Sequence, residues 1–117
     1  MRLLNSLIVV LVMASGCGKK DPEFTVTYKT TIDNNSYTTI RYTDGTGQIK
    51  SLYQQPGNFS YTFTTTQAPD SGSLSLEIGS FNSKTVTAQI TINDKVVGYY
   101  AGFGNFYGYA KITNNRY

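Results

Sequence analysis

One residue of this sequence has a type and a position that predict covalent chemistry. Cys17 is the single cysteine of the 117-residue chain, and it follows a basic residue, an apolar run and three small residues. These parts are Arg2, Leu3–Met13 and Ala14–Gly16. This order is typical of a bacterial lipoprotein signal, in which a peptidase cuts before the cysteine. We therefore expect residues 1–16 to be a signal peptide that is removed, and acyl chains to be joined to the Cys17 sulfur and to the new amino terminus.

Two other interpretations of this segment fit the residues less well. A membrane-spanning helix needs roughly 18–20 apolar residues, and the run before Cys17 is shorter. A plain secretory signal would leave an unpaired thiol in an oxidising compartment. With a lipid on Cys17, residues 17–23 form a short charged tether that contains Lys19, Lys20, Asp21, Pro22 and Glu23. We expect the protein to be lipid-anchored in the bacterial cell envelope, on the outer membrane and facing either the periplasm or the surface.

A second stretch, Gly98–Ala110, has a composition that suggests binding, because rings and glycines alternate there without a charged residue. Its candidate binding residues are Tyr99, Tyr100, Phe103, Phe106, Tyr107 and Tyr109. If the stretch forms a hairpin around Gly102–Asn105, half of these rings point outward, where rings can stack on sugars or anchor a protein partner. Two alternatives remain. The rings could fill the core in place of the Trp that the chain lacks, or the uncharged strand edge could self-associate.

The residue types argue against catalysis and against metal binding. The sequence has no histidine and no cysteine after Cys17, so the commonest general bases and metal ligands are missing. The carboxylates Asp33, Asp44, Asp70 and Asp94 fall in predicted turns, where aspartate caps backbone N–H groups. The formal net charge is +3, but the basic residues are scattered and form no stripe for nucleic acid. We expect a protein that is not an enzyme, holds no cofactor or metal and binds no nucleic acid, with a hydrolase as the weakest alternative.

The elements that position these residues are predicted to be β-strands, because apolar and polar residues alternate from Phe24 onward. Turn residues separate the alternating segments, for example Asp44–Gly47. The pattern predicts strands near residues 25–32, 37–43, 48–54, 59–66, 73–80, 84–92, 96–101 and 107–113. Short strands at this spacing are typical of antiparallel sandwiches and barrels. We expect residues 24–117 to form one all-β domain, an antiparallel Ig-like β-sandwich of seven to eight strands.

The order of these motifs resembles MmpS, a family of small exported β-sandwich proteins. The resemblance rests on Val26–Tyr28, Thr39–Asp44, Pro56 followed by Phe59, and Val86–Ile92 running into Asn93–Val97. It implies an Ig-like sandwich and a place beside RND-type transporters, which the family accompanies in mycobacterial envelopes. The family typically carries two domain cysteines and a membrane helix, whereas this chain has Cys17 alone and a predicted lipid anchor. The resemblance therefore favours the fold more than it favours a transporter partner.

Together these observations predict a small membrane-anchored envelope lipoprotein that acts as a non-enzymatic binding or accessory module. It could assist a transporter or another envelope complex, since a lipid on Cys17 keeps the domain near membrane partners and raises its effective concentration. The alternative is a surface module that binds carbohydrate or another ligand through the exposed rings of residues 98–110. The expected partners are the membrane, through the lipid, and an envelope protein or a glycan.

Overall fold

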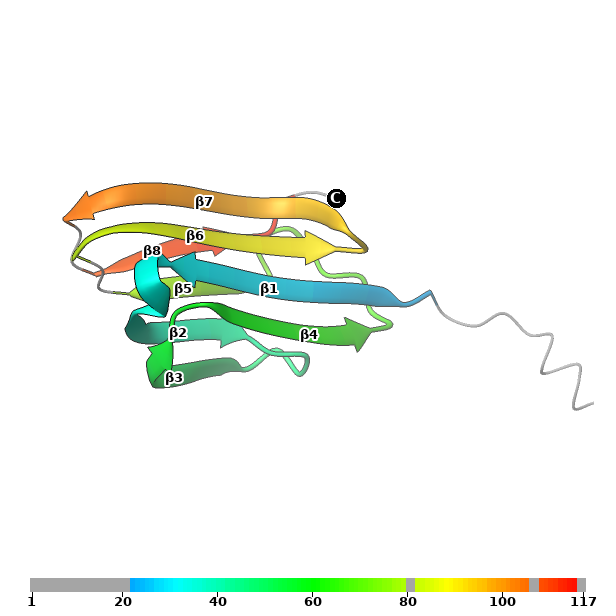
Figure 1. Ribbon diagram of the computed structural model, residues 1–117. Coiled ribbons are helices and arrows are strands. Elements are labelled where there is room, and N and C mark those ends of the chain that lie inside the picture. The colour runs from blue at the N-terminus through cyan, green and yellow to red at the C-terminus, as the bar shows by residue number, and fades with distance from the viewer. Residues whose placement is uncertain (1–21, 80–81, 106–107, 116–117) are drawn as a thin grey trace, which may run out of the picture.

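The computed structural model describes residues 22–79, 82–105 and 108–115, which form two antiparallel sheets of four strands each (Figure 1). Sheet A has the strand order β4-β1-β6-β7, and sheet B has the order β3-β2-β5-β8. The strands are β1 (Phe24–Ile32), β2 (Tyr37–Thr43), β3 (Ile49–Pro56), β4 (Phe59–Thr65), β5 (Ser75–Gly79), β6 (Asn82–Ile92), β7 (Lys95–Asn105) and β8 (Tyr109–Thr113). The prediction of an all-β fold is confirmed.

Helical structure is limited to one short turn in the part of the chain that the structure describes. This turn is the 3-10 segment η1 (Asp33–Asn35), which connects β1 in sheet A with β2 in sheet B. Among these same residues, no helix has the length and hydropathy needed to cross a membrane. Cys17 and the predicted signal peptide lie outside the described residues.

The alternation seen in the sequence decides which face of each strand is buried. On β1, Val26, Tyr28 and Ile32 are buried, while Thr25 and Lys29 are exposed on the opposite face. Successive strand residues point to opposite sides of a sheet, so each sheet has one buried face. The two buried faces contribute to one hydrophobic core. The buried hydrophobic residues are Val26, Tyr28, Ile32, Ile40, Tyr42, Leu74, Leu76, Ile78, Val86, Ala88, Ile90, Ile92, Val97, Ala110 and Ile112.

Two hairpin turns form where the turn residues predict them. Between β2 and β3, the backbone N–H of Asp44 donates to the carbonyl oxygen of Gln48 at 2.8 Å. Between β6 and β7, Asn93 and Asp94 both have a positive φ, of 51° and 66°. Two consecutive positive φ values are typical of a type I′ turn, whose twist matches that of the flanking strands. These turns are local, so the sequence was sufficient to predict them.

The hairpin considered around Gly102–Asn105 does not form. β7 continues in sheet A through these residues and pairs with β6 as far as Asn105, whereas β8 belongs to sheet B and pairs with β5. The long partner strand β6 offers β7 a continuous hydrogen-bond ladder, and this outweighs the local turn preference of the glycines. Gly102 serves a different purpose, because a Cβ there would collide with the hydroxyl of Tyr100.

Candidate binding surfaces

The six rings predicted as binding residues do not form one patch. Tyr99 and Phe103 point outward from sheet A, with 59% and 73% of their surface exposed. Tyr100 lies on the inner face of the same strand and packs, partly buried, against the core. Tyr109 is 45% exposed on sheet B, the other sheet. The remaining two, Phe106 and Tyr107, lie outside the described residues.

Tyr100 therefore packs against the core, while Tyr99 and Phe103 are exposed to solvent. The alternation of β7 against β6 explains the difference, because Tyr100 is paired with the buried Ala88 and Tyr99 with Gln89. The absence of a side chain at Gly102 leaves room for the Tyr100 ring. The sequence left open whether these rings pack in the core or lie on the surface. Core packing holds for Tyr100, and surface exposure holds for Tyr99 and Phe103.

Sheet B carries a set of outward residues that was not predicted from the sequence, which we call the tyrosine face: Tyr37, Tyr53, Tyr109 and Arg41. Tyr37 is 69% exposed and Tyr53 is 73% exposed. The signal for Tyr37 was present in the sequence, since the buried Ile40 and Tyr42 place odd-numbered residues of β2 on the outer face. The signal for Tyr53 was weaker, because the register between β2 and β3 shifts beside it.

The charged residue of the tyrosine face, Arg41, is held in place by its neighbours. The Arg41 guanidinium nitrogen Nη1 lies 3.4 Å from the Glu77 carboxylate oxygen Oε1, and the guanidinium carbon lies 5.8 Å from the centroid of the Tyr109 ring. Glycine at position 79 allows this arrangement, since a Cβ there would lie 2.6 Å from a Tyr109 ring carbon. The strand register continues the row of charges from Arg41 through Glu77 to Lys111. Tyr and Arg are, together with Trp, the residue types enriched at the energetic centres of protein interfaces.

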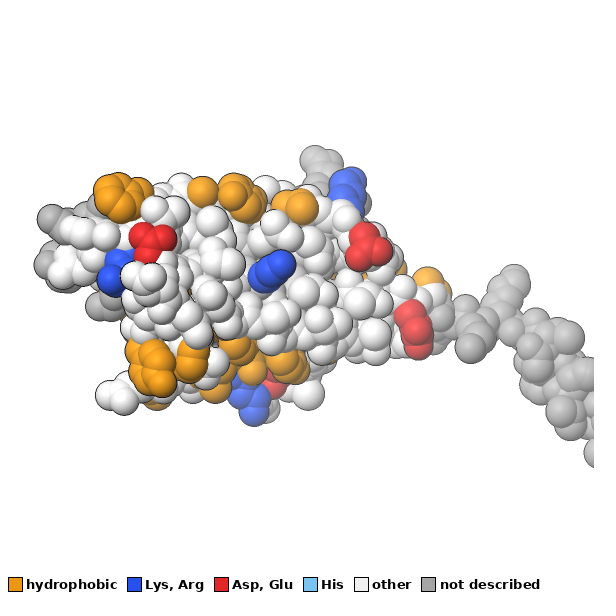
Figure 2. All heavy atoms as spheres, viewed as in Figure 1, with side chains coloured by type: hydrophobic (Ala, Val, Ile, Leu, Met, Phe, Trp, Pro, Cys, Tyr) orange, Lys and Arg blue, Asp and Glu red, His pale blue; other side chains and the backbone are white. Residues whose placement is uncertain are grey.

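Sheet A has an outer face of a different kind, which we call the hydroxyl face. It is made by the outward residues of β1, β4 and β6, and nearly all of them carry a hydroxyl group. They are Thr25, Thr27, Lys29, Thr31, Ser60, Thr62, Thr64, Thr85, Thr87, Gln89 and Thr91. Figure 2 shows this face as largely uncharged, with hydrophobic side chains along its border over β7.

Hydrogen bonds between neighbouring strands order some of these hydroxyl groups. The hydroxyl oxygens of Thr27 and Thr62 lie 3.0 Å apart, and those of Thr31 and Thr87 lie 2.5 Å apart. A hydroxyl group has one proton and two lone pairs, so each of these side chains can still bond to a ligand. The face is therefore a regular array of donors and acceptors.

A polar cleft of about 250 Å³ lies between the β2–β3 turn and the segment that follows β4. Asp44, Phe63, Gln67 and Asp70 are among the residues that line it. Within the described part of the chain, no group of three or more His, Cys, Asp or Glu side chains could hold a metal ion.

Asp44 has a structural role in this cleft. Its Oδ1 atom accepts hydrogen bonds from the Thr46 hydroxyl at 2.7 Å, the Thr46 N–H at 2.8 Å and the Gln48 N–H at 3.0 Å. These bonds, with the Thr46 hydroxyl as the largest contributor, lower the pKa of the Asp44 carboxyl group, and the Lys50 ammonium 3.8 Å away acts in the same direction. The prediction that this aspartate caps its turn is confirmed.

Comparison with known proteins does not assign this chain to a family. No protein-family model matches it, and no curated protein matches it. The likeness to MmpS rests on the sequence motifs alone.

Proposed function

We propose that this protein is a lipid-anchored envelope protein whose domain, an Ig-like β-sandwich, docks a protein partner through the tyrosine face. The motif that ends at Cys17 supports the anchor, and residues 17–23 supply a short tether to β1. Two four-stranded antiparallel sheets with a shared core support the sandwich assignment. The domain acts by binding and carries out no reaction of its own.

One observation carries the docking proposal: three exposed tyrosines share an outer face with an arginine that is already held in position. Each tyrosine offers a large ring with a polar tip, and a ring loses little rotamer freedom when it is covered. The contacts of Arg41 with Glu77 and Tyr109 restrict the guanidinium before any partner arrives. Such preorganisation lowers the entropy that binding costs. An envelope membrane protein with an exposed carboxylate opposite Arg41 is the partner that this face fits.

The lipid anchor supplies the second part of the mechanism. A lipid on Cys17 confines the domain to the membrane surface, so a modest affinity for a membrane partner is sufficient for occupancy. More than one acyl chain is needed for stable attachment, since a single chain binds membranes only weakly. The transporter role implied by the MmpS resemblance is one form of this function.

The anchor is tested by metabolic labelling of the full-length protein with an alkynyl fatty acid in a bacterium. The wild type should take up the label, and the Cys17→Ser variant should not. Equal labelling of the two proteins would show that the lipid assignment is wrong.

The docking face is tested by photo-cross-linking of the full-length protein in intact cells. A photoreactive amino acid replaces Thr39 on the tyrosine face or, as the matched control, Thr87 on the hydroxyl face. Both threonines are outward and half-buried in central strands. A discrete adduct with a protein should form from position 39 alone and should disappear when Tyr53→Ala and Tyr109→Ala are added. An identical adduct from both positions, or an adduct that survives both changes, would refute docking through this face.

A further inference from the structure

We infer that the hydroxyl face of sheet A, together with Tyr99 and Phe103 of β7, binds a neutral polysaccharide chain. This surface is distinct from the tyrosine face, which belongs to the other sheet. The inference goes beyond the proposed docking function and holds or fails separately from it.

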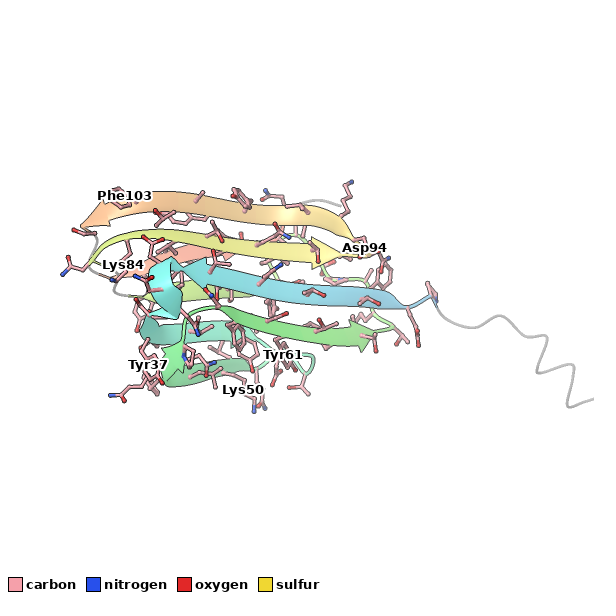
Figure 3. The ribbon with its side chains drawn as sticks, in the orientation of Figure 1. Tyr37, Lys50, Tyr61, Lys84, Asp94 and Phe103 are labelled. Carbon is pink, nitrogen blue, oxygen red and sulfur yellow. The ribbon has the colours of Figure 1, made fainter. Side chains whose placement is uncertain are left out.

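The two rings stand in line on one strand. Tyr99 and Phe103 are four residues apart on the outward side of β7, so they are separated by about 13 Å at roughly 3.3 Å per residue. Ala101 lies between them and is exposed, and its small side chain leaves the space between the two rings open. Phe103 is labelled in Figure 3, near the end of β7 that is remote from the start of β1. Two rings at this spacing offer stacking platforms for separate sugar units of one short oligosaccharide segment.

Hydrogen-bonding groups lie directly beside the rings. The strand register places Tyr99 next to Gln89, then Lys29, then Ser60, each on the adjoining strand and about 4.8 Å further across the sheet. A second row follows two residues along, and it places Ala101 next to Thr87 and Thr31. Amide and hydroxyl groups both donate and accept, which matches the hydroxyl groups of a sugar. A glycan stacked on β7 would therefore find polar partners on β6 and β1.

The charge of the surface indicates a neutral ligand. Lys29 is the one charged residue among the outward strand residues of the hydroxyl face. The Asp33 carboxylate lies at the Phe103 end of this face, where it accepts a hydrogen bond of 2.9 Å from the backbone N–H of Thr85, the residue paired with Phe103. Acidic polysaccharides are bound by clusters of basic groups, which this face lacks.

A lipid surface and a second copy of this chain are the two alternative occupants of this surface. A lipid surface requires a continuous apolar patch flanked by basic residues, whereas hydroxyl groups adjoin these rings. A second copy paired along the free edge of β7 would use the backbone of that strand and would change the oligomeric state.

The test uses the full-length protein in detergent micelles and an immobilised panel of polysaccharides. Neutral members are β-glucan, mannan, xylan and dextran, and acidic members are polygalacturonate and heparin. We expect binding to at least one neutral polysaccharide, with about tenfold weaker affinity for Tyr99→Ala and for Phe103→Ala, as for the central residues of other binding surfaces. Tyr53→Ala is the matched control, since Tyr53 and Phe103 are each 73% exposed on an edge strand. This control should bind as tightly as the wild type.

Three results would overturn the inference. They are binding to no neutral polysaccharide, a preference for the acidic members, or neutral binding that both alanine variants retain. Ring-dependent binding to phosphatidylethanolamine–phosphatidylglycerol vesicles, or ring-dependent dimers without glycan binding, would assign the surface to one of the other occupants instead. The variants Tyr99→Phe and Phe103→Tyr keep a ring and should keep binding, so the test stands even if an alanine variant fails to fold. Loss of glycan binding leaves the cross-linking result at position 39 unaffected, and the two proposals are therefore separable.

Discussion

The hydroxyl of Tyr28 on β1 donates a hydrogen bond of 2.5 Å to the carbonyl oxygen of Thr43 on β2, and this bond joins the two sheets inside the core. The Tyr28 ring is fully buried and lies 5.7 Å from the ring of Tyr42, between centroids. Burial is the main cause that raises the pKa of the Tyr28 hydroxyl well above its usual value, so the group stays protonated and continues to donate.

Replacing this hydroxyl should weaken the contact between the sheets. We expect Tyr28→Phe to lower the free energy of unfolding by about 1–2 kcal/mol, because the buried carbonyl of Thr43 loses its donor. Urea denaturation measures the change. Tyr37→Phe removes a hydroxyl from a side chain that is 69% exposed, and this control should stay within about 0.5 kcal/mol of the wild type. Equal effects of the two changes would show that the hydrogen bond contributes nothing to stability.

Acid should remove the stabilisation that the Asp44 carboxylate provides. Its pKa is lower in the folded protein than the ordinary value of 3.8. Such a group adds stability above its unfolded pKa and loses it as the pH falls through the folded pKa. The free energy of unfolding of Asp44→Asn should therefore lie below that of the wild type at pH 7, with a difference that shrinks below about pH 4.

Thr46→Ala provides the graded control for Asp44. It removes the hydroxyl bond to Oδ1 but keeps the bond from the Thr46 backbone N–H, so its effect should be smaller and should follow the same pH direction. A difference between wild type and Asp44→Asn that is as large at pH 3 as at pH 7 would contradict the role of the charged form.

The ion pair of the tyrosine face should contribute more to geometry than to stability. A double-mutant cycle of Arg41→Ala and Glu77→Ala should give a coupling energy of about 0.2–1 kcal/mol, because the Arg41 side chain is 39% exposed and solvent screens the pair. The coupling should fall further in 1 M salt. A coupling that is unchanged by salt would indicate that the pair is shielded from solvent.

The close approach of β7 to β8 should make Gly98 intolerant of a side chain. A Cβ at this position would lie 2.7 Å from the backbone oxygen of Thr113, which cannot move without its strand. We expect Gly98→Ala to lower the free energy of unfolding by about 1–3 kcal/mol, as in other overpacked sites. Ala101→Ser, on the exposed side of the same strand, should change it little. Thermal unfolding followed by circular dichroism compares the two, and an unchanged midpoint for Gly98→Ala would refute the close packing.

Much of the fold could be predicted from the sequence because the relevant signals are local. Alternation along a strand fixes which side chains face inward, so Val26 and Tyr28 on β1 could be assigned to the core. Aspartate, asparagine and glycine at turns act on their own backbone, so the turns at Asp44 and at Asn93 were also predictable.

The grouping of the rings could not be predicted, because it depends on which sheet each strand joins. Tyr99 and Tyr109 lie ten residues apart in the chain and yet face outward from different sheets. Tyr53 and Tyr109 are far apart in the chain and share an outer face, since β2 and β5 lie between their strands. Likewise, the threonines of β1, β4 and β6 form one face only because these strands pair.

The sequence by itself therefore determined the strands, their buried sides and the cysteine that is predicted to carry the lipid. Tertiary structure alone decided the pairing of β7 with β6, the separation of β8 into sheet B and the surfaces that result. The physical reason is that strand pairing is a competition among distant backbone ladders, and its outcome depends on how all the strands bury their apolar faces together.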